Sequence, residues 1–136
     1  MDTQIFINLP VRDLPKSLNF FHSLGFSHNS QFTDDTAACI VISPVIHVML
    51  LTEAKFREFA PRGICDTSQA NEVLICLTCE SRDKVDELVR QALAAGGSSH
   101  EPPTDYGFMY QHSFLDLDNH GWALMYMEPG AKICNS

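Results

Sequence analysis

The chain has 136 residues, with 9 Lys and Arg against 17 Asp and Glu, which gives a formal net charge of −8. Hydrophobic residues make up 45% and charged residues 19%, a balance that is typical of a globular domain and excludes a disordered chain. Scattered basic residues argue against nucleic acid as a partner, and no apolar run reaches the roughly 20 residues of a membrane span. Because the start of the chain lacks the basic region of a signal peptide, we expect a cytoplasmic protein with reduced cysteines.

The first half of the chain shows one helix and several strands. Alternating apolar residues predict a strand over 5–11. Asp13 is suited to cap a helix with Pro15 in its first turn, and Gly25 to end it. Three further strands are predicted, followed by a short helix that leads into a loop: strands at about 26–32, 36–43 and 46–52, and the helix within 53–65.

The second half repeats this order of elements. A strand at 73–79 leads into a helix at 82–95, which Gly96 and Gly97 end. Residues 117–120 form a tight turn in which Asn119 tolerates a positive φ. The remaining predicted strands are 98–101, 108–116 and 121–127.

The two halves align with each other as an internal duplication. Residues 6–13 match residues 74–81, an offset of 74 − 6 = 68, and each segment feeds a helix and then three strands. The pattern predicts an α+β fold in which two tandem βαβββ modules form a curved mixed sheet around a central cleft. We expect a single domain over 1–136, with repeats at about 3–60 and 71–128.

Several motifs resemble the vicinal oxygen chelate superfamily, which includes glyoxalase I, bleomycin-resistance proteins and extradiol dioxygenases. They are Asn8–Leu14 with Ser17 and Phe20-Phe21, then Leu24-Gly25-Phe26, and finally Phe114–Asn119 before the last strand. Phe108-Met109-Tyr110 and Ser113-Phe114 resemble a bacterial branch of predicted lactoylglutathione lyases. The resemblance covers nearly the whole chain and implies the glyoxalase-like fold.

The resemblance also implies where a metal would bind. Metal-using relatives hold one divalent ion through four side chains, and those positions fall here on Phe6, Leu50, Leu74 and Ala123, with Met49 as the alternative to Leu50. The superfamily places His or Glu there because imidazole nitrogens and carboxylate oxygens donate lone pairs to the ion. None of these side chains carries nitrogen or oxygen. We therefore expect no metal at this site and no cofactor.

Other polar residues are weaker candidates for chemistry. His47 and His112 lie on predicted strands and either face the cleft or have a structural role. Glu72 is two residues before Leu74 and so faces the same side of the strand, where it could stand at the mouth of the pocket. Tyr110 and Arg62 are candidate orienting groups, and Arg62 would suit a carboxylate or phosphate. We expect three other histidines to be solvated: His22 in the first predicted helix, His28 at the start of the second strand and His120 in a turn.

Two functions fit these observations. One is a metal-independent protein that binds a small organic ligand in an apolar cleft, and the other is a lyase or isomerase that uses Glu72, His47, Tyr110 or His112 as acid and base. A third reading is that the apolar side chains only fill the cleft. We expect a homodimer, because relatives of this size usually pair. The expected ligand-binding residues are Phe6, Asn8, Leu50, Arg62, Leu74, Cys76, Thr78, Tyr110, Ala123 and Met125.

Overall fold

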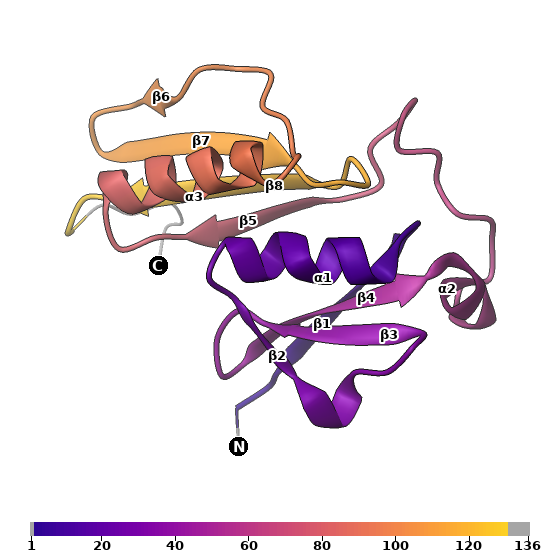
Figure 1. The fold of residues 1–136 in the computed structure, drawn as a ribbon. Coiled ribbons are helices and arrows are strands. Elements are labelled where there is room, and N and C mark those ends of the chain that lie inside the picture. The colour runs from indigo at the N-terminus through magenta and orange to yellow at the C-terminus, as the bar shows by residue number, and fades with distance from the viewer. Residues whose placement is uncertain (1, 131–136) are drawn as a thin grey trace. The chain divides into compact units, whose positions relative to one another are not determined.

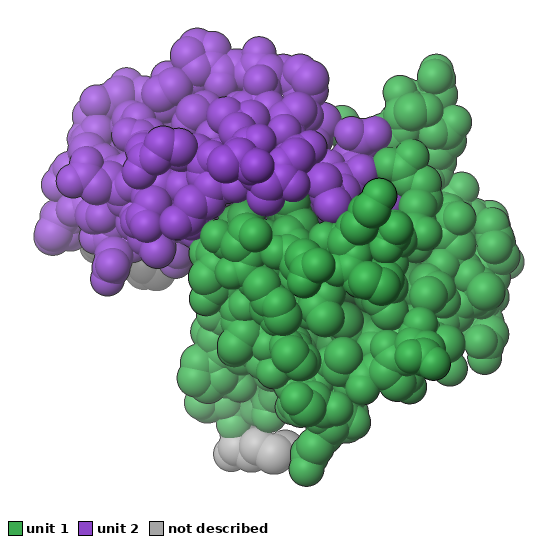
Figure 2. Space-filling view, in the orientation of Figure 1, with its two compact units in different colours: residues 1–72 green, residues 73–136 purple. Residues whose placement is uncertain are grey.

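The computed structural model describes residues 2–130 of the chain. It divides into two compact units, residues 1–72 and 73–136 (Figure 2). Four cysteines carry free thiols, and Cys134 lies outside the described residues. Within residues 2–130, no helix combines the length and the apolar character that a membrane span requires.

The first unit is a four-stranded mixed sheet with α1 on one face. Its strands are ordered β1-β4-β3-β2, with β1 parallel to β4 and the other neighbours antiparallel (Figure 1). In chain order the elements are β1 (Ile5–Val11), α1 (Leu14–Ser23), β2 (Ser27–Asn29), the 3-10 helix η1 (Ser30–Phe32), β3 (Ala37–Val41), β4 (Ile46–Thr52) and α2 (Glu53–Phe59).

Local sequence sets both ends of α1. The Asp13 carboxylate accepts a hydrogen bond from the Lys16 backbone N–H at 3.1 Å, so the predicted N-cap is confirmed. The chain leaves the helix through Gly25, whose φ of 94° lies in the left-handed region that favours glycine. Phe20 and Phe21 are buried with their rings edge to face, and α1 packs on β3 and β4.

The second unit repeats the architecture of the first. Its sheet has the order β5-β8-β7-β6, again with the first strand parallel to its neighbour, here β5 to β8, and the other neighbours antiparallel, and α3 packs on β7 and β8 (Figure 1). The prediction of two βαβββ modules is therefore confirmed. The elements are β5 (Leu74–Thr78), α3 (Arg82–Ala94), β6 (Thr104–Asp105), β7 (Met109–Leu115) and β8 (Gly121–Met127).

The structure corrects the predicted strand at 98–101. Only Ser98 pairs there, in an isolated bridge to Leu115, and the edge strand is the two-residue β6. Pro102 and Pro103 lie between these positions and have no backbone N–H to donate to a ladder, so the pairing is interrupted. The predicted strand at 26–32 is also shorter, because the Asn29 side chain accepts from the Gln31 N–H and begins η1.

A buried carboxylate organises the turn between β7 and β8. One oxygen of Asp116 accepts from the backbone N–H groups of Asp118 and His120, at 2.9 and 3.0 Å. The other accepts from the indole N–H of Trp122 at 3.0 Å. Burial raises the pKa of Asp116, while His120 and these hydrogen bonds act in the opposite direction. The prediction that His120 is solvated is wrong, because only 1% of it is exposed.

Candidate functional site

The two faces of the first sheet differ in what covers them. Leu9, Ile40 and Val48 share one face by ladder register and are buried on the side of α1. Leu50 belongs to this same face and is 0% exposed, so its predicted place in a ligand site is wrong. The alternative, Met49, pairs with Asn8 and lies on the opposite face.

We call that opposite face, formed by Phe6, Asn8, His47 and Met49, the first open face. Phe6 is 46% exposed although it is a large aromatic residue. Its ring stacks on His47, with centroids 4.4 Å apart and planes 8° from parallel. His47 is only 8% exposed, and its Nδ1 atom is buried without a hydrogen-bond partner among the described residues. The structure thus places His47 beside Phe6, which the sequence left open.

The second sheet has a matching open face. Ladder register places Leu74, Cys76, Thr78, Ala123 and Met125 together, and we call these five residues the second open face. Leu74 is 73% exposed, the largest fraction among the exposed large hydrophobic residues described. The neighbouring positions in each strand point to the other side, where the sheet is buried against α3. This side carries Ile75, Trp122 and Leu124.

Tyr110 and His112 do not lie on the second open face. They pair with Tyr126 and Leu124 in β7 and β8, which places them on the side of α3. The Tyr110 hydroxyl donates to the Asp86 carboxylate of α3 at 2.6 Å. His112 Nδ1 lies 4.0 Å from the same carboxylate. The structure therefore places both residues on the opposite side of the sheet from Leu74 and Ala123. This position does not support Tyr110 as a ligand-binding residue beside them, or either residue as an acid or base on that face.

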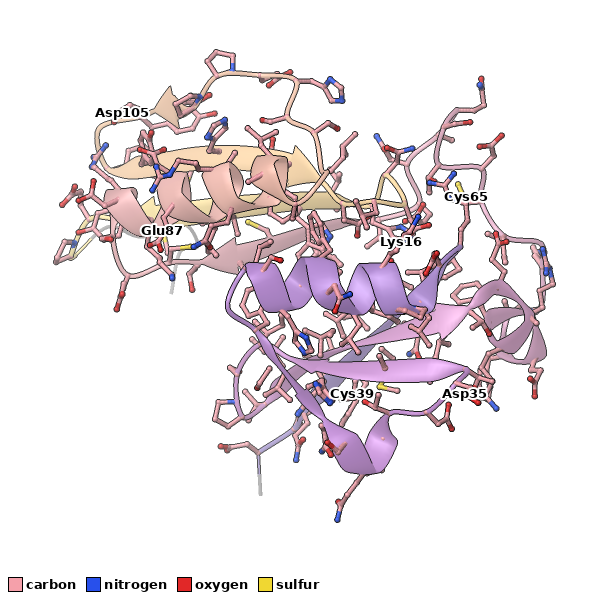
Figure 3. All side chains as sticks on the ribbon, viewed as in Figure 1. Lys16, Asp35, Cys39, Cys65, Glu87 and Asp105 are labelled. Atoms are coloured by element: carbon pink, nitrogen blue, oxygen red, sulfur yellow. The ribbon has the colours of Figure 1, made fainter. Side chains whose placement is uncertain are left out.

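An arginine cluster that sequence reasoning missed joins α3 to the end of the β7–β8 pair where β7 begins and β8 ends. The Arg82 guanidinium forms ion pairs with Asp105 at 2.9 Å and Glu128 at 3.1 Å, and lies 5.3 Å from the Tyr110 ring centroid. Asp105 is on the short β6 (Figure 3). The Gly107 N–H and then Arg82 lower the pKa of Asp105. The partners lie 23 and 46 residues from Arg82 along the chain, so spacing gave no signal.

The hydrogen bond to Asp86 predicts a loss of stability in strong base. With burial, it raises the pKa of Tyr110 from 10.0 to about 12, so the folded protein holds this proton more tightly than the unfolded chain does. The contribution is complete below pH 10 and is lost as the pH rises through about 12. Urea midpoints measured from pH 9 to 12 should therefore fall less steeply for Tyr110→Phe than for the parent protein, and Tyr106→Phe, at an exposed site, should follow the parent. Parallel curves for all three proteins would contradict the assignment.

Arg62 and Glu72 are in the segment that follows α2. Both are exposed, and Arg62 lies in a bend outside any helix or strand. Burial and then the charge of Glu72 raise the pKa of the Cys65 thiol, so this carboxylate lies near a neighbouring loop residue. The roles of Arg62 in anion binding and of Glu72 in proton transfer stay predictions.

Comparison with known proteins identifies the family. Residues 4–126 match the sequence profile of the Glyoxalase/Bleomycin resistance protein/Dioxygenase superfamily. The chain belongs to this superfamily. No protein with a curated description matches it.

Solved structures agree with this membership. A hypothetical protein from S. aureus is 31% identical, with a TM-score of 0.77 over 93% of this chain and 95% of the other. A superfamily enzyme from Burkholderia phytofirmans is 16% identical, with a TM-score of 0.76 over 93% and 100%. A genomically encoded fosfomycin resistance protein from Listeria monocytogenes is 19% identical, with a TM-score of 0.66 over 95% and 96%. The last two show likeness of fold.

The residues at the superfamily's metal positions do not fit a divalent ion. With β4 corrected, the positions are Phe6 and Met49 on the first open face and Leu74 and Ala123 on the second. Their only heteroatom is the Met49 thioether sulfur, a soft ligand that does not suit Mg²⁺, Mn²⁺ or Zn²⁺ in place of imidazole and carboxylate. Among residues 2–130, no group of three or more His, Cys, Asp and Glu side chains is placed to hold an ion.

Proposed function

We propose that this superfamily member binds a small organic ligand against its open sheet faces without using the superfamily's metal. The observation that carries the proposal is the exposure of Phe6 and Leu74 at two of the metal positions. Each of these large apolar side chains is exposed on its own sheet, and exposed apolar surface of this kind commonly marks a ligand or partner site. Asn8 and Thr78 add hydrogen-bonding groups to the same faces, which is the composition of sites for small organic molecules.

His47 supplies a directional polar group within this apolar surface. A buried nitrogen without a hydrogen-bond partner costs free energy, about 1–3 kcal/mol for a typical polar group. A ligand that presents a hydroxyl, carbonyl or carboxyl group to Nδ1 would recover that cost, while its apolar part covers the Phe6 ring. This arrangement favours an amphipathic ligand over a purely hydrocarbon one.

Substitutions on each face test the proposal. Probes are bleomycin, fosfomycin and the hemithioacetal of methylglyoxal and glutathione, each titrated by calorimetry. Phe6→Ala should weaken binding of any probe that the parent protein binds by roughly 10- to 100-fold. The reason is that it removes an aromatic contact with the ligand worth about 1.5–3 kcal/mol. His47→Gln should weaken binding of polar probes, and Leu74→Ser tests the second open face separately. Phe32→Ala, at an exposed site on η1, is the matched control and should bind as the parent does. Equal affinities for Phe6→Ala and the control would refute a site at the first open face.

The same samples distinguish the enzyme hypothesis. Protein treated with chelator and dialysed should bind the positive probe with unchanged affinity. Turnover of the hemithioacetal without added metal would favour the lyase or isomerase hypothesis over binding alone. Turnover that depends on added Ni²⁺ or Zn²⁺ would contradict the metal-independent proposal. Light scattering of these samples also tests the expected homodimer, since a mass near 15.2 kDa would mean a monomer.

A further inference from the structure

Two imidazole rings face each other away from the open faces. His22 Nε2 and His28 Nδ1 are 2.9 Å apart, with ring centroids separated by 5.0 Å and planes tilted by 41°. His22 belongs to the last turn of α1 and His28 to β2. His28 is opposite Ile40 in the ladder, so the pair lies on the side of the sheet that α1 covers.

The local chain brings these rings together. The Gly25 N–H donates to the His22 carbonyl, and the positive φ of Gly25 turns the chain so that β2 returns alongside the end of α1. His22 is exposed and His28 is half-buried, so ions in solution can reach the pair. Sequence spacing of six residues does not match a helical ligand pair such as His-x-x-x-His, which explains why the pair was not predicted.

We propose that His22 and His28 chelate a divalent transition-metal ion of the Ni²⁺, Cu²⁺ or Zn²⁺ group. Two nitrogens at right angles on one ion, each about 2.0–2.1 Å from it, are about 2.9 Å apart. That spacing already exists between the two rings, and small rotations of the side chains would aim both lone pairs at a shared ion. Imidazole is a favoured ligand for these metals.

Two neighbouring features support a cation at this position. The C-terminal end of α1 carries the negative end of the helix dipole, which favours positive charge beside its last turn. Ser30 Oγ lies 3.5 Å from His28 Nε2 and can accept a hydrogen bond from an Nε2–H, and in that tautomer the Nδ1 lone pair is available to bind a metal. Correspondingly, His22 would carry its proton on Nδ1 and bind through Nε2. No proton need be released from the two neutral rings.

Two protein ligands define a reversible site whose other positions are filled by water. Structural zinc sites use four protein ligands and catalytic ones use three, so this site should exchange its metal during dialysis against chelator. The site lies on the α1 side of the first sheet, whereas Phe6 and Met49 lie on the opposite face, so it is separate from these metal positions of the superfamily. It does not depend on the proposed ligand function.

Calorimetric titration of tag-free, chelator-treated protein with Ni²⁺ tests the site. We expect one equivalent to bind, and His22→Gln or His28→Gln to weaken binding at least about tenfold, because each removes one of two protein ligands. His100→Gln is the matched control, since His100 is also exposed and within hydrogen-bond distance of a serine hydroxyl, at 3.4 Å. The control should bind Ni²⁺ as the parent does. Absence of binding, or equal binding by the parent and both single variants, would overturn the proposal.

Proton NMR gives a readout that a merely structural role would not move. Paramagnetic Ni²⁺ at low molar ratio should selectively broaden the imidazole C–H signals of His22 and His28, which the single variants assign, and should leave those of His100 sharp. Saturating Ni²⁺ should also raise the thermal midpoint of the parent protein and of His100→Gln, but not of the other two variants. Uniform broadening of all histidine signals would show adventitious binding and would overturn the assignment.

Discussion

Replacing Asp116 with alanine is expected to destabilise the second unit by about 2–4 kcal/mol, because it leaves several buried donors without partners. Two of these are backbone N–H groups in the β7–β8 turn, those of Asp118 and His120. The third is the indole N–H of Trp122, a residue that is itself 1% exposed. Since the carboxylate is buried, water does not readily replace it.

Urea unfolding followed by tryptophan fluorescence measures this effect, because Trp122 is the chain's single tryptophan and contacts Asp116 directly. Asp116→Asn should lower the free energy of unfolding less than Asp116→Ala does, because the amide keeps one accepting oxygen. It should still destabilise the protein, because its NH₂ group cannot accept from the remaining donor. Asp35→Asn is the control, because Asp35 is exposed in a turn of the first unit (Figure 3). A change in the free energy of unfolding below about 1 kcal/mol for Asp116→Ala would contradict the network's structural role.

Phe20→Ala is expected to destabilise the first unit by about 3–5 kcal/mol, the usual range for removing a buried aromatic ring from a core. Phe20 is 2% exposed, and its ring meets Phe21 edge to face with centroids 5.1 Å apart. The substitution therefore removes apolar burial from the seam between α1 and the sheet and leaves a cavity there. Far-UV circular dichroism in urea gives the measurement.

Phe32→Ala provides the matched comparison for this core substitution. It removes the same ring from η1, where the side chain is exposed, and should change the free energy of unfolding by less than about 1 kcal/mol. If Phe20→Ala and Phe32→Ala had equal unfolding midpoints, the packing of α1 against the sheet would be contradicted.

The fold could be predicted from sequence because its signals are local and occur twice. Asp13 and Gly25 mark the ends of α1, and the apolar alternation of β1 identifies its buried face. In β4 this alternation fails, because the strand reads Ile-His-Val-Met-Leu-Leu-Thr and buries residues from both faces. A register error of one residue then exchanges Met49 for Leu50 and moves the predicted site residue to the wrong side of the sheet.

The candidate site was predicted less well because its polar partners are distant in sequence. Tyr110 bonds Asp86 across 24 residues, and no periodicity within β7 indicates that contact. Turns usually lie in solvent, so the sequence predicts a solvated His120, but this turn is buried, with its backbone N–H groups bonded to the Asp116 carboxylate. By contrast, strand parity alone predicts that Phe6, Asn8, Leu74 and Ala123 share faces opposite the buried positions of their strands, and the ladder register places them there.

The separation of the two sheets along the chain has a consequence for synthesis on the ribosome. Among the described residues, the strand ladders of the first sheet join positions between 5 and 52, and those of the second join positions between 74 and 127. A chain that grows by about 5–20 residues per second therefore presents every strand of the first sheet several seconds before the last strand of the second is made. Early pairing would occupy both edges of β3 and β4 and one edge of β1 before the strands of the second half can compete for them. Such an order favours correct assembly of two similar modules that could otherwise exchange strands.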